Sequence, residues 1–122
     1  YIEQGEMFFK LYDFGKASGC FNTAITKLSR NINNYLSIHK LKFIDIKLGC
    51  EKYKKHVNEY NDVLKIADIY RKIGIICFDK GETESAVRCF KASSEIKNCT
   101  ITGEKLIARR AEHNMYIGDI IK

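Results

Sequence analysis

Three histidines and five cysteines are the residues whose side chains could bind a metal ion or attack a substrate. The histidines, at positions 39, 56 and 113, have no second ligand at a helical spacing of three or four residues. Cys50 precedes His56 by six residues, which does not place both side chains on one helix face. No serine has a neighbouring histidine-and-acid pattern, and no glycine-rich phosphate loop occurs. We therefore expect no catalytic centre, no metal site and no cofactor, and a protein that is not an enzyme.

The cysteines also bear on location. Five is an odd number, and no two of them share a short paired spacing. This pattern is typical of reduced thiols, and it favours an intracellular protein of the cytoplasm or nucleus. No apolar run approaches the roughly 18 residues of a membrane span, and no signal peptide is visible. Because the first residue is Tyr1, we expect a piece of a longer protein.

A lysine-rich stretch at positions 39–56 is the most basic part of a chain whose net charge is +6. Lysines interleaved with Phe43 and Tyr53 could bind nucleic acid through phosphate contacts and base stacking. The same stretch could be the solvated face of two amphipathic helices, and we favour this because it contains no arginine. In that interpretation the buried stripe is Leu41, Ile44 and Leu48.

These residues must be positioned by helices. The chain contains no proline, and its eight glycines are scattered singly, which favours an almost entirely helical protein. The helical period is clearest at positions 64–97, where one face is formed by Leu64, Ala67, Tyr70, Ile73, Gly74 and Cys77. Gly81 is placed to end that helix, and the acidic and hydroxyl residues at 82–85 suit the start of the next.

Seven residues of this hairpin resemble, in order and spacing, the tetratricopeptide repeat, a helix-turn-helix unit of about 34 residues. They are Tyr70, Ile73, Gly74, Gly81, Ala86, Phe90 and Ser93. The resemblance implies antiparallel helix hairpins that stack as a right-handed superhelix, an all-α solenoid. The spacing also has a physical reason, because two helices in close contact need small residues where they cross, with a bulky side chain beside them.

The same intervals recur at Gly5, Phe8, Phe14, Ala17, Phe21 and Ala24, 69 residues earlier. We therefore expect a single domain of about three and a half repeats. Its units would be repeat 1 at 1–31, a degenerate repeat 2 at 32–64, repeat 3 at 65–98 and a half repeat or capping helix at 103–122. In repeat 2 the expected helices are 32–47 and 51–63, with Gly49 near the turn.

The resemblance places a partner-binding surface on the concave side, which the first helix of each pair lines. Transferred residue by residue, this surface contains Ile2, Glu6, Phe9, Ile38, Lys42, Asp68, Arg71, Ile75, Phe78, Glu112, Met115 and Asp119. The four residues between 68 and 78 also share one helix face by spacing alone. For Phe78, packing against a neighbouring repeat is an equally good interpretation.

We expect a non-catalytic protein–protein interaction scaffold that binds a peptide or helix of another protein. Because the surface mixes acids with apolar residues, the partner should carry apolar anchors and some lysine or arginine. The lysine and asparagine clamp with which some family members hold a C-terminal carboxylate is not reproduced. Two alternatives stay open, a nucleic-acid-binding module using residues 40–56 and an adaptor similar to the soluble NSF attachment proteins. Self-association is left open as well.

Overall fold

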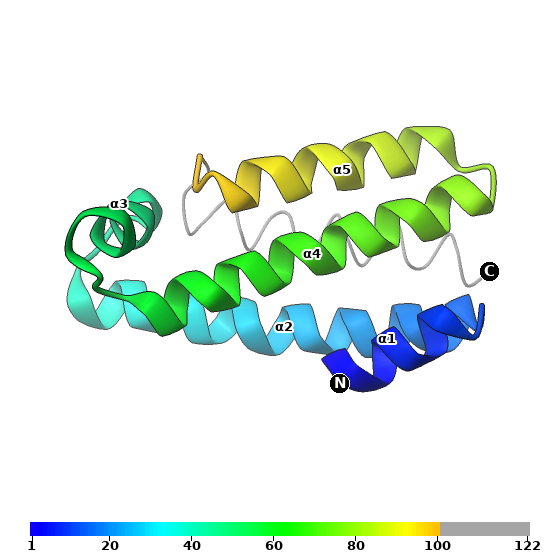
Figure 1. The fold of residues 1–122 in the computed structure, drawn as a ribbon, viewed down its shortest axis with the longest axis horizontal. Coiled ribbons are helices and arrows are strands. Elements are labelled where there is room, and N and C mark those ends of the chain that lie inside the picture. The colour runs from blue at the N-terminus through cyan, green and yellow to red at the C-terminus, as the bar shows by residue number, and fades with distance from the viewer. Residues whose placement is uncertain (101–122) are drawn as a thin grey trace.

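The computed structural model describes residues 1–100, which form five α-helices (Figure 1). The helices are α1 (Ile2–Lys10), α2 (Phe14–His39), α3 (Phe43–Tyr53), α4 (Val57–Asp79) and α5 (Thr83–Lys97). No strand occurs in this part of the chain, so the prediction of an all-α protein is confirmed. The half repeat expected at 103–122 lies outside the described residues.

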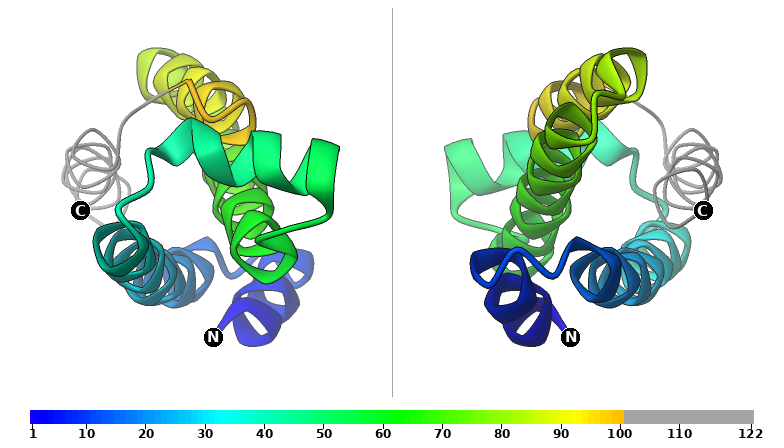
Figure 2. Two further views of the ribbon diagram at one scale, coloured as in Figure 1. Left: turned by 90° about the vertical axis from the view of Figure 1, so that its left-hand side faces the viewer. Right: turned by 90° about the vertical axis from the view of Figure 1, so that its right-hand side faces the viewer.

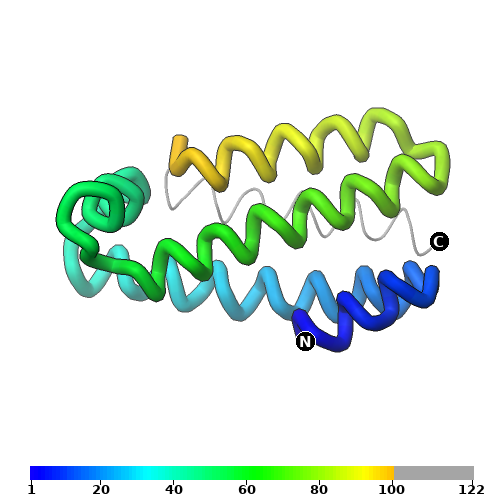
Figure 3. The backbone as a smooth tube through the Cα atoms, viewed as in Figure 1, coloured from blue at the N-terminus to red at the C-terminus, as the bar shows by residue number. Residues whose placement is uncertain are grey.

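The long axis of the molecule is followed by α1, α2, α4 and α5, and each of these helices is antiparallel to the next (Figures 1 and 3). α1 packs on the first half of α2, α4 lies between α2 and α5, and α3 packs on α4. The end-on views in Figure 2 show α3 crossing the end of the bundle where α2 ends and α4 begins. The core is therefore centred on α2 and α4.

Isoleucines spaced by three, four or seven residues form most of this core. On α2 the buried residues include Ile25, Ile32 and Leu36. α4 is buried on two sides, since it packs against both α2 and α5. Its fully buried isoleucines are Ile66, Ile69, Ile73 and Ile76.

The α1–α2 and α4–α5 hairpins close with the same turn, 69 residues apart. In the first, the Tyr12 N–H donates to the Phe9 carbonyl at 3.1 Å; in the second, the Gly81 N–H donates to the Phe78 carbonyl at 3.0 Å. Both turn residues have a left-handed backbone conformation, with φ of 60° at Tyr12 and 80° at Gly81. The predicted end of α4 near Gly81 is therefore confirmed.

Both hairpins also contain the same glycine–phenylalanine contact. A Cβ atom added at Gly5 would lie 2.6 Å from Phe21 Cε1, and one added at Gly74 would lie 2.6 Å from Phe90 Cε1. In each pair the missing side chain lets the aromatic ring of the second helix rest on the backbone of the first. The close approach inferred from the spacing of Gly74 and Phe90 is confirmed.

The helix boundaries expected between residues 32 and 63 are wrong. α2 continues through residue 32 to His39, and the chain then turns at 40–42, inside the helix expected at 32–47. A second break at 54–56 falls inside the helix expected at 51–63. The expected repeat boundaries after residues 31 and 64 lie within α2 and α4, because no glycine or proline interrupts either helix there.

Gly49 lies in α3, not in a turn, and its lack of a side chain lets the His56 ring approach the helix closely. A Cβ atom at this position would lie 2.8 Å from Cδ2 of His56. The other side of the His56 ring faces α2, where Nδ1 is 2.5 Å from the Tyr35 hydroxyl. His56 thus links α3 to α2 just before α4 begins.

Candidate protein-binding surface

The α1–α4 face is formed by Glu6 of α1 and by Asp68, Arg71, Ile75 and Phe78 of α4. The two helices are joined here by an ion pair between Lys72 and Glu6, whose Nζ–Oε1 distance is 2.7 Å. The structure thus brings together predicted residues from two helices that are more than 60 positions apart in the sequence.

Asp68 is at the centre of the polar half of this face. Its Oδ1 atom accepts hydrogen bonds from Nε of Arg71 at 3.3 Å and from Nη2 at 3.0 Å. Its Oδ2 atom lies 3.0 Å from Nζ of Lys72. The three residues stand at i, i+3 and i+4 of one helix, where side chains are neighbours. Glu6, Asp68, Arg71 and Lys72 therefore form one connected network with a formal charge of zero.

The network shifts the titration of its members. Partial burial acts to raise the pKa of Asp68, but the hydrogen bonds from Lys72 and Arg71 outweigh it, so the pKa is lowered from 3.8. For Lys72, partial burial acts to lower the pKa, but the hydrogen bonds to Glu6 and Asp68 raise it above 10.5. Both groups therefore hold their charges at neutral pH. Sequence reasoning missed Lys72, although its spacing of four from Asp68 was a visible signal.

The apolar half of the face lies one and two turns further along α4. Ile75 is 36% exposed and Phe78 is 66% exposed, whereas Ile76 and Cys77 beside them are fully buried. Phe78 is thus a surface residue of the described part of the chain. Phe78 stands two helical turns from Arg71, and exposed aromatic and arginine side chains are the residue types enriched in binding hot spots.

Phe9 occupies a different environment from Phe78, its counterpart 69 residues later. Its ring packs within its own hairpin, with centroids 5.8 Å from Phe14 and 6.4 Å from Phe21.

Lys42 stands at the start of α3, where its backbone N–H donates to the Asp45 carboxylate at 2.7 Å. The structure therefore does not place Lys42 on the α1–α4 face. The predicted residues Glu112, Met115 and Asp119 lie outside the described residues.

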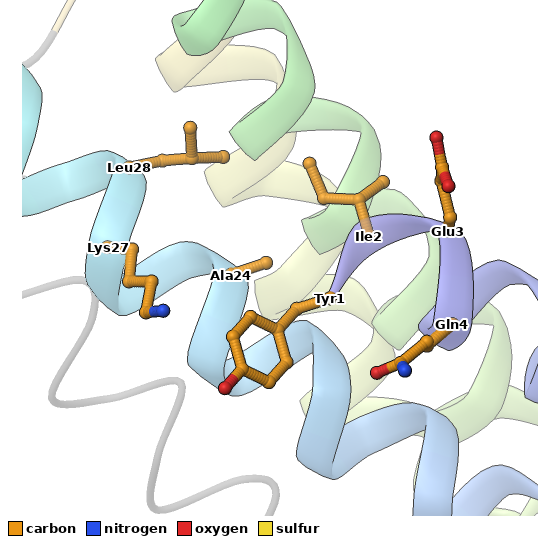
Figure 4. Close-up of a pocket in the computed structure, with 7 residues that line it drawn as sticks. All are labelled: Tyr1, Ile2, Glu3, Gln4, Ala24, Lys27 and Leu28. Carbon is orange, nitrogen blue, oxygen red and sulfur yellow. The ribbon is translucent and has the colours of Figure 1, made fainter.

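A groove of about 670 Å³ lies between α1 and α2, next to Ile2 (Figure 4). Figure 4 shows its lining residues, which are Tyr1, Ile2, Glu3, Gln4, Ala24, Lys27 and Leu28. The Lys27 Nζ atom lies 4.5 Å from the centroid of the Tyr1 ring, a cation–π geometry. The lining of the groove is mainly apolar, with one carboxylate, Glu3, and one ammonium group, Lys27.

The two described histidines both contact Tyr35. The His39 ring lies tilted by 43° against the Tyr35 ring, with centroids 4.3 Å apart, and His56 is hydrogen-bonded to the same tyrosine. Burial raises the pKa of the Cys99 thiol to about 11, so this thiol is protonated and a poor nucleophile at neutral pH. Within residues 1–100 no group of three metal-binding side chains comes together. His113 lies outside the described residues.

Two further findings bear on the class of protein. None of the helices in residues 1–100 combines the length and the apolarity that crossing a membrane requires. Comparisons with protein-family models, with curated proteins and with solved structures gave no match.

Proposed function

We propose that this chain is a non-catalytic protein-binding module, and that its α1–α4 face binds a helix or an extended peptide of another protein. The observation that supports this most is the exposure of Phe78, at 66%, on the same helix as the ion-pair network that ties α1 to α4. Such a ring is costly to leave in water, and covering it on binding is favourable. The tetratricopeptide-like organisation, with the concave side as binding surface, is part of the same proposal.

The chemistry of the partner follows from which charges are already paired. Glu6 and Asp68 are engaged by Lys72 and Arg71, so they offer little net attraction to an incoming cation. The exposed acids nearest to Phe78 along the chain are Asp79, Glu82 and Glu84, around the α4–α5 turn. We therefore assign the partner an apolar anchor that covers Phe78, with lysine or arginine beside it that faces this turn.

The double variant Arg71→Glu with Phe78→Ala tests the proposal. A partner recovered with the wild-type chain from its own cells is purified, and its Kd is measured by calorimetry. The double variant should weaken binding at least 30-fold, because the loss of even one hot-spot residue costs about 2 kcal/mol or more and two such losses do not simply add. Circular dichroism should stay helical, because both side chains are exposed.

A matched control is the double variant Arg30→Glu with Val57→Ala, which changes the same kinds of exposed side chain away from this face. It should bind as the wild type does. Full binding by the Arg71→Glu, Phe78→Ala variant, or equal loss in the control, would show that another surface holds the partner.

A further inference from the structure

The end of the bundle formed by α3 and its flanking turns, residues 38–57, concentrates the positive charge of the protein. We call it the α3 corner. Residues 39–56 contain six lysines and two acids, a net charge of +4 out of +6 for the whole chain. Figures 1 and 2 show that this segment lies across one end of the molecule, away from the α4–α5 turn. The protein therefore has a strongly basic end.

Both acids of the α3 corner already have partners. Asp45 accepts a hydrogen bond from the backbone N–H of Lys42, and Glu51 lies 4.0 Å from Nζ of Lys47. The side chains of Lys40, Lys52 and Lys54 are exposed. With six lysines against two acids, the net field of this surface is positive.

Large apolar side chains are exposed among these lysines. Ile38 is 75% exposed and Tyr53 is 71% exposed, and Val57 adds a third exposed side chain where α4 begins. On α3 itself, Ile44 and Leu48 stand one helical turn apart and are both partly open to water. The buried stripe expected at Leu41, Ile44 and Leu48 is thus only partly buried, and α3 packs on the bundle chiefly through Phe43 and Ile46.

The α3 corner is held in place before any ligand binds. The His56 ring rests on Gly49 of α3 and is hydrogen-bonded to Tyr35 of α2. These contacts join α3 to α2 at the turn before α4. A basic and partly apolar surface is thus presented ready-made at an outward-facing end.

We propose that the α3 corner binds the surface of an anionic phospholipid bilayer. Lysines meet lipid phosphates and carboxylates, while their aliphatic stems and the exposed Ile38, Leu48 and Val57 enter the boundary between headgroups and acyl chains. Nucleic acid fits less well, because it needs a basic groove with aromatic stacking platforms, whereas four of the five exposed apolar residues here are aliphatic. Peripheral membrane binding is independent of the partner-binding face.

Vesicle co-sedimentation of the full chain tests this inference, with phosphatidylcholine vesicles alone and with phosphatidylserine added. The wild type should partition onto the anionic vesicles at low salt, and high salt should release it. The triple variant Lys52→Gln, Lys54→Gln, Lys55→Gln should weaken partitioning about 100-fold, since each basic residue near such a surface contributes about five-fold. Removing the same charge at the opposite end, with Lys10→Gln, Lys16→Gln and Lys80→Gln, should change it several-fold at most.

A second pair of variants tests the apolar contribution, which separates a bilayer from other polyanions. Ile38→Ser with Tyr53→Ser should reduce partitioning about ten-fold or more, whereas Leu11→Ser with Tyr12→Ser, exposed at the other end, should have no effect. The same proteins are titrated with a single-stranded oligonucleotide by fluorescence anisotropy.

Three results would overturn the inference. They are no binding to anionic vesicles at low salt, equal losses in both lysine triple variants, and unchanged vesicle binding by the Ile38→Ser, Tyr53→Ser variant together with tight oligonucleotide binding. The last result would assign the α3 corner to nucleic acid.

Discussion

Replacing Gly5 by alanine measures how tightly the first hairpin is packed. The added Cβ atom would lie 2.6 Å and 2.7 Å from two atoms of the Phe21 ring, well inside van der Waals contact. Phe21 has no exposed surface, and its ring also packs against Phe9, so it has no open side toward which to turn. The structure must therefore absorb the methyl group by moving α1 away from α2.

The net effect combines two opposing terms. Alanine in place of glycine inside a helix gains about 1 kcal/mol of helix propensity, whereas an extra methyl in a filled core costs roughly 1–3 kcal/mol. Gly5→Ala should thus lower the free energy of unfolding by up to about 2 kcal/mol, toward the upper end of this range because the ring cannot yield. In urea, with an m value of about 2 kcal/mol/M, the midpoint should fall by up to roughly 1 M.

Two other glycines give matched comparisons. Gly19 lies in α2 with nothing within 4 Å of an added Cβ atom, so Gly19→Ala should stabilise by about 0.5–1 kcal/mol. Gly74→Ala makes the same 2.6 Å contact as Gly5→Ala, but with Phe90, which is 39% exposed and can rotate outward. Its effect should stay within about 1 kcal/mol of zero.

Urea unfolding followed by circular dichroism decides among these outcomes. A double-mutant cycle adds Phe21→Leu, in whose background Gly5→Ala should become neutral or stabilising. If Gly5→Ala raises the midpoint as much as Gly19→Ala does, then Phe21 is not held against α1, and the packing argument for the first hairpin is refuted.

Two smaller effects follow from single contacts. The folded-state pKa of Asp68 lies below its ordinary value, so its contribution to stability is complete above the unfolded-state pKa and is lost as pH falls through the folded-state pKa. Asp68→Asn should therefore flatten the dependence of the urea midpoint on pH below about pH 4. Because the Asp68 side chain is 44% exposed, the substitution should lower the free energy of unfolding at neutral pH by no more than about 1 kcal/mol. If the urea midpoint of the variant changes with pH below about pH 4 as steeply as that of the wild type, the network does not stabilise the fold. The Ser93 hydroxyl donates to the Ala67 carbonyl at 2.6 Å, so Ser93→Ala should lower the free energy of unfolding in urea by about 0.5–1.5 kcal/mol. Ser94 is exposed, and Ser94→Ala should change it by almost nothing. Equal values for the two variants would show that the Ser93 hydrogen bond contributes nothing.

The two hairpins could be predicted from the sequence because local signals mark them. Gly81 marks one turn, and the paired glycine and phenylalanine positions fix which helix faces meet. At the other turn Tyr12 has the same left-handed backbone without being glycine, so the recurring intervals, and not the turn residue, located it.

The middle of the chain could not be predicted because its breaks carry no such signal. α2 and α3 are separated by a left-handed Lys40, and α3 and α4 by Lys54 and His56, none of which is a typical helix breaker. Gly49, the one residue that looked like a turn, is explained by the approach of the His56 ring. Tertiary packing decides these boundaries, and the one local signal was Asp45, which caps α3 three residues after Lys42.

On the candidate surface, Asp68, Arg71, Ile75 and Phe78 lie within α4 at their predicted three- and four-residue spacing, and each is half-buried or exposed. The spacing did not show that Lys72 neutralises Glu6, since that contact joins two helices far apart in the sequence. Nor did it separate Phe9 from Phe78, which stand at equivalent positions but differ in what lies beside them.

The left-handed residues also indicate how the protein could be made more robust. Among residues 1–100, five that are not glycine have positive φ, namely Tyr12, Lys40, Lys54, His56 and Cys99. A side chain in this conformation costs roughly 1 kcal/mol that glycine would not, partly offset by the greater freedom of glycine in the unfolded chain. The free energy of unfolding of a domain is of order 5–15 kcal/mol, so glycine at the exposed sites Tyr12, Lys40 and Lys54 could raise it by a useful fraction. Tyr12→Gly would place glycine at the left-handed position of both turns, and we expect it to raise the melting temperature.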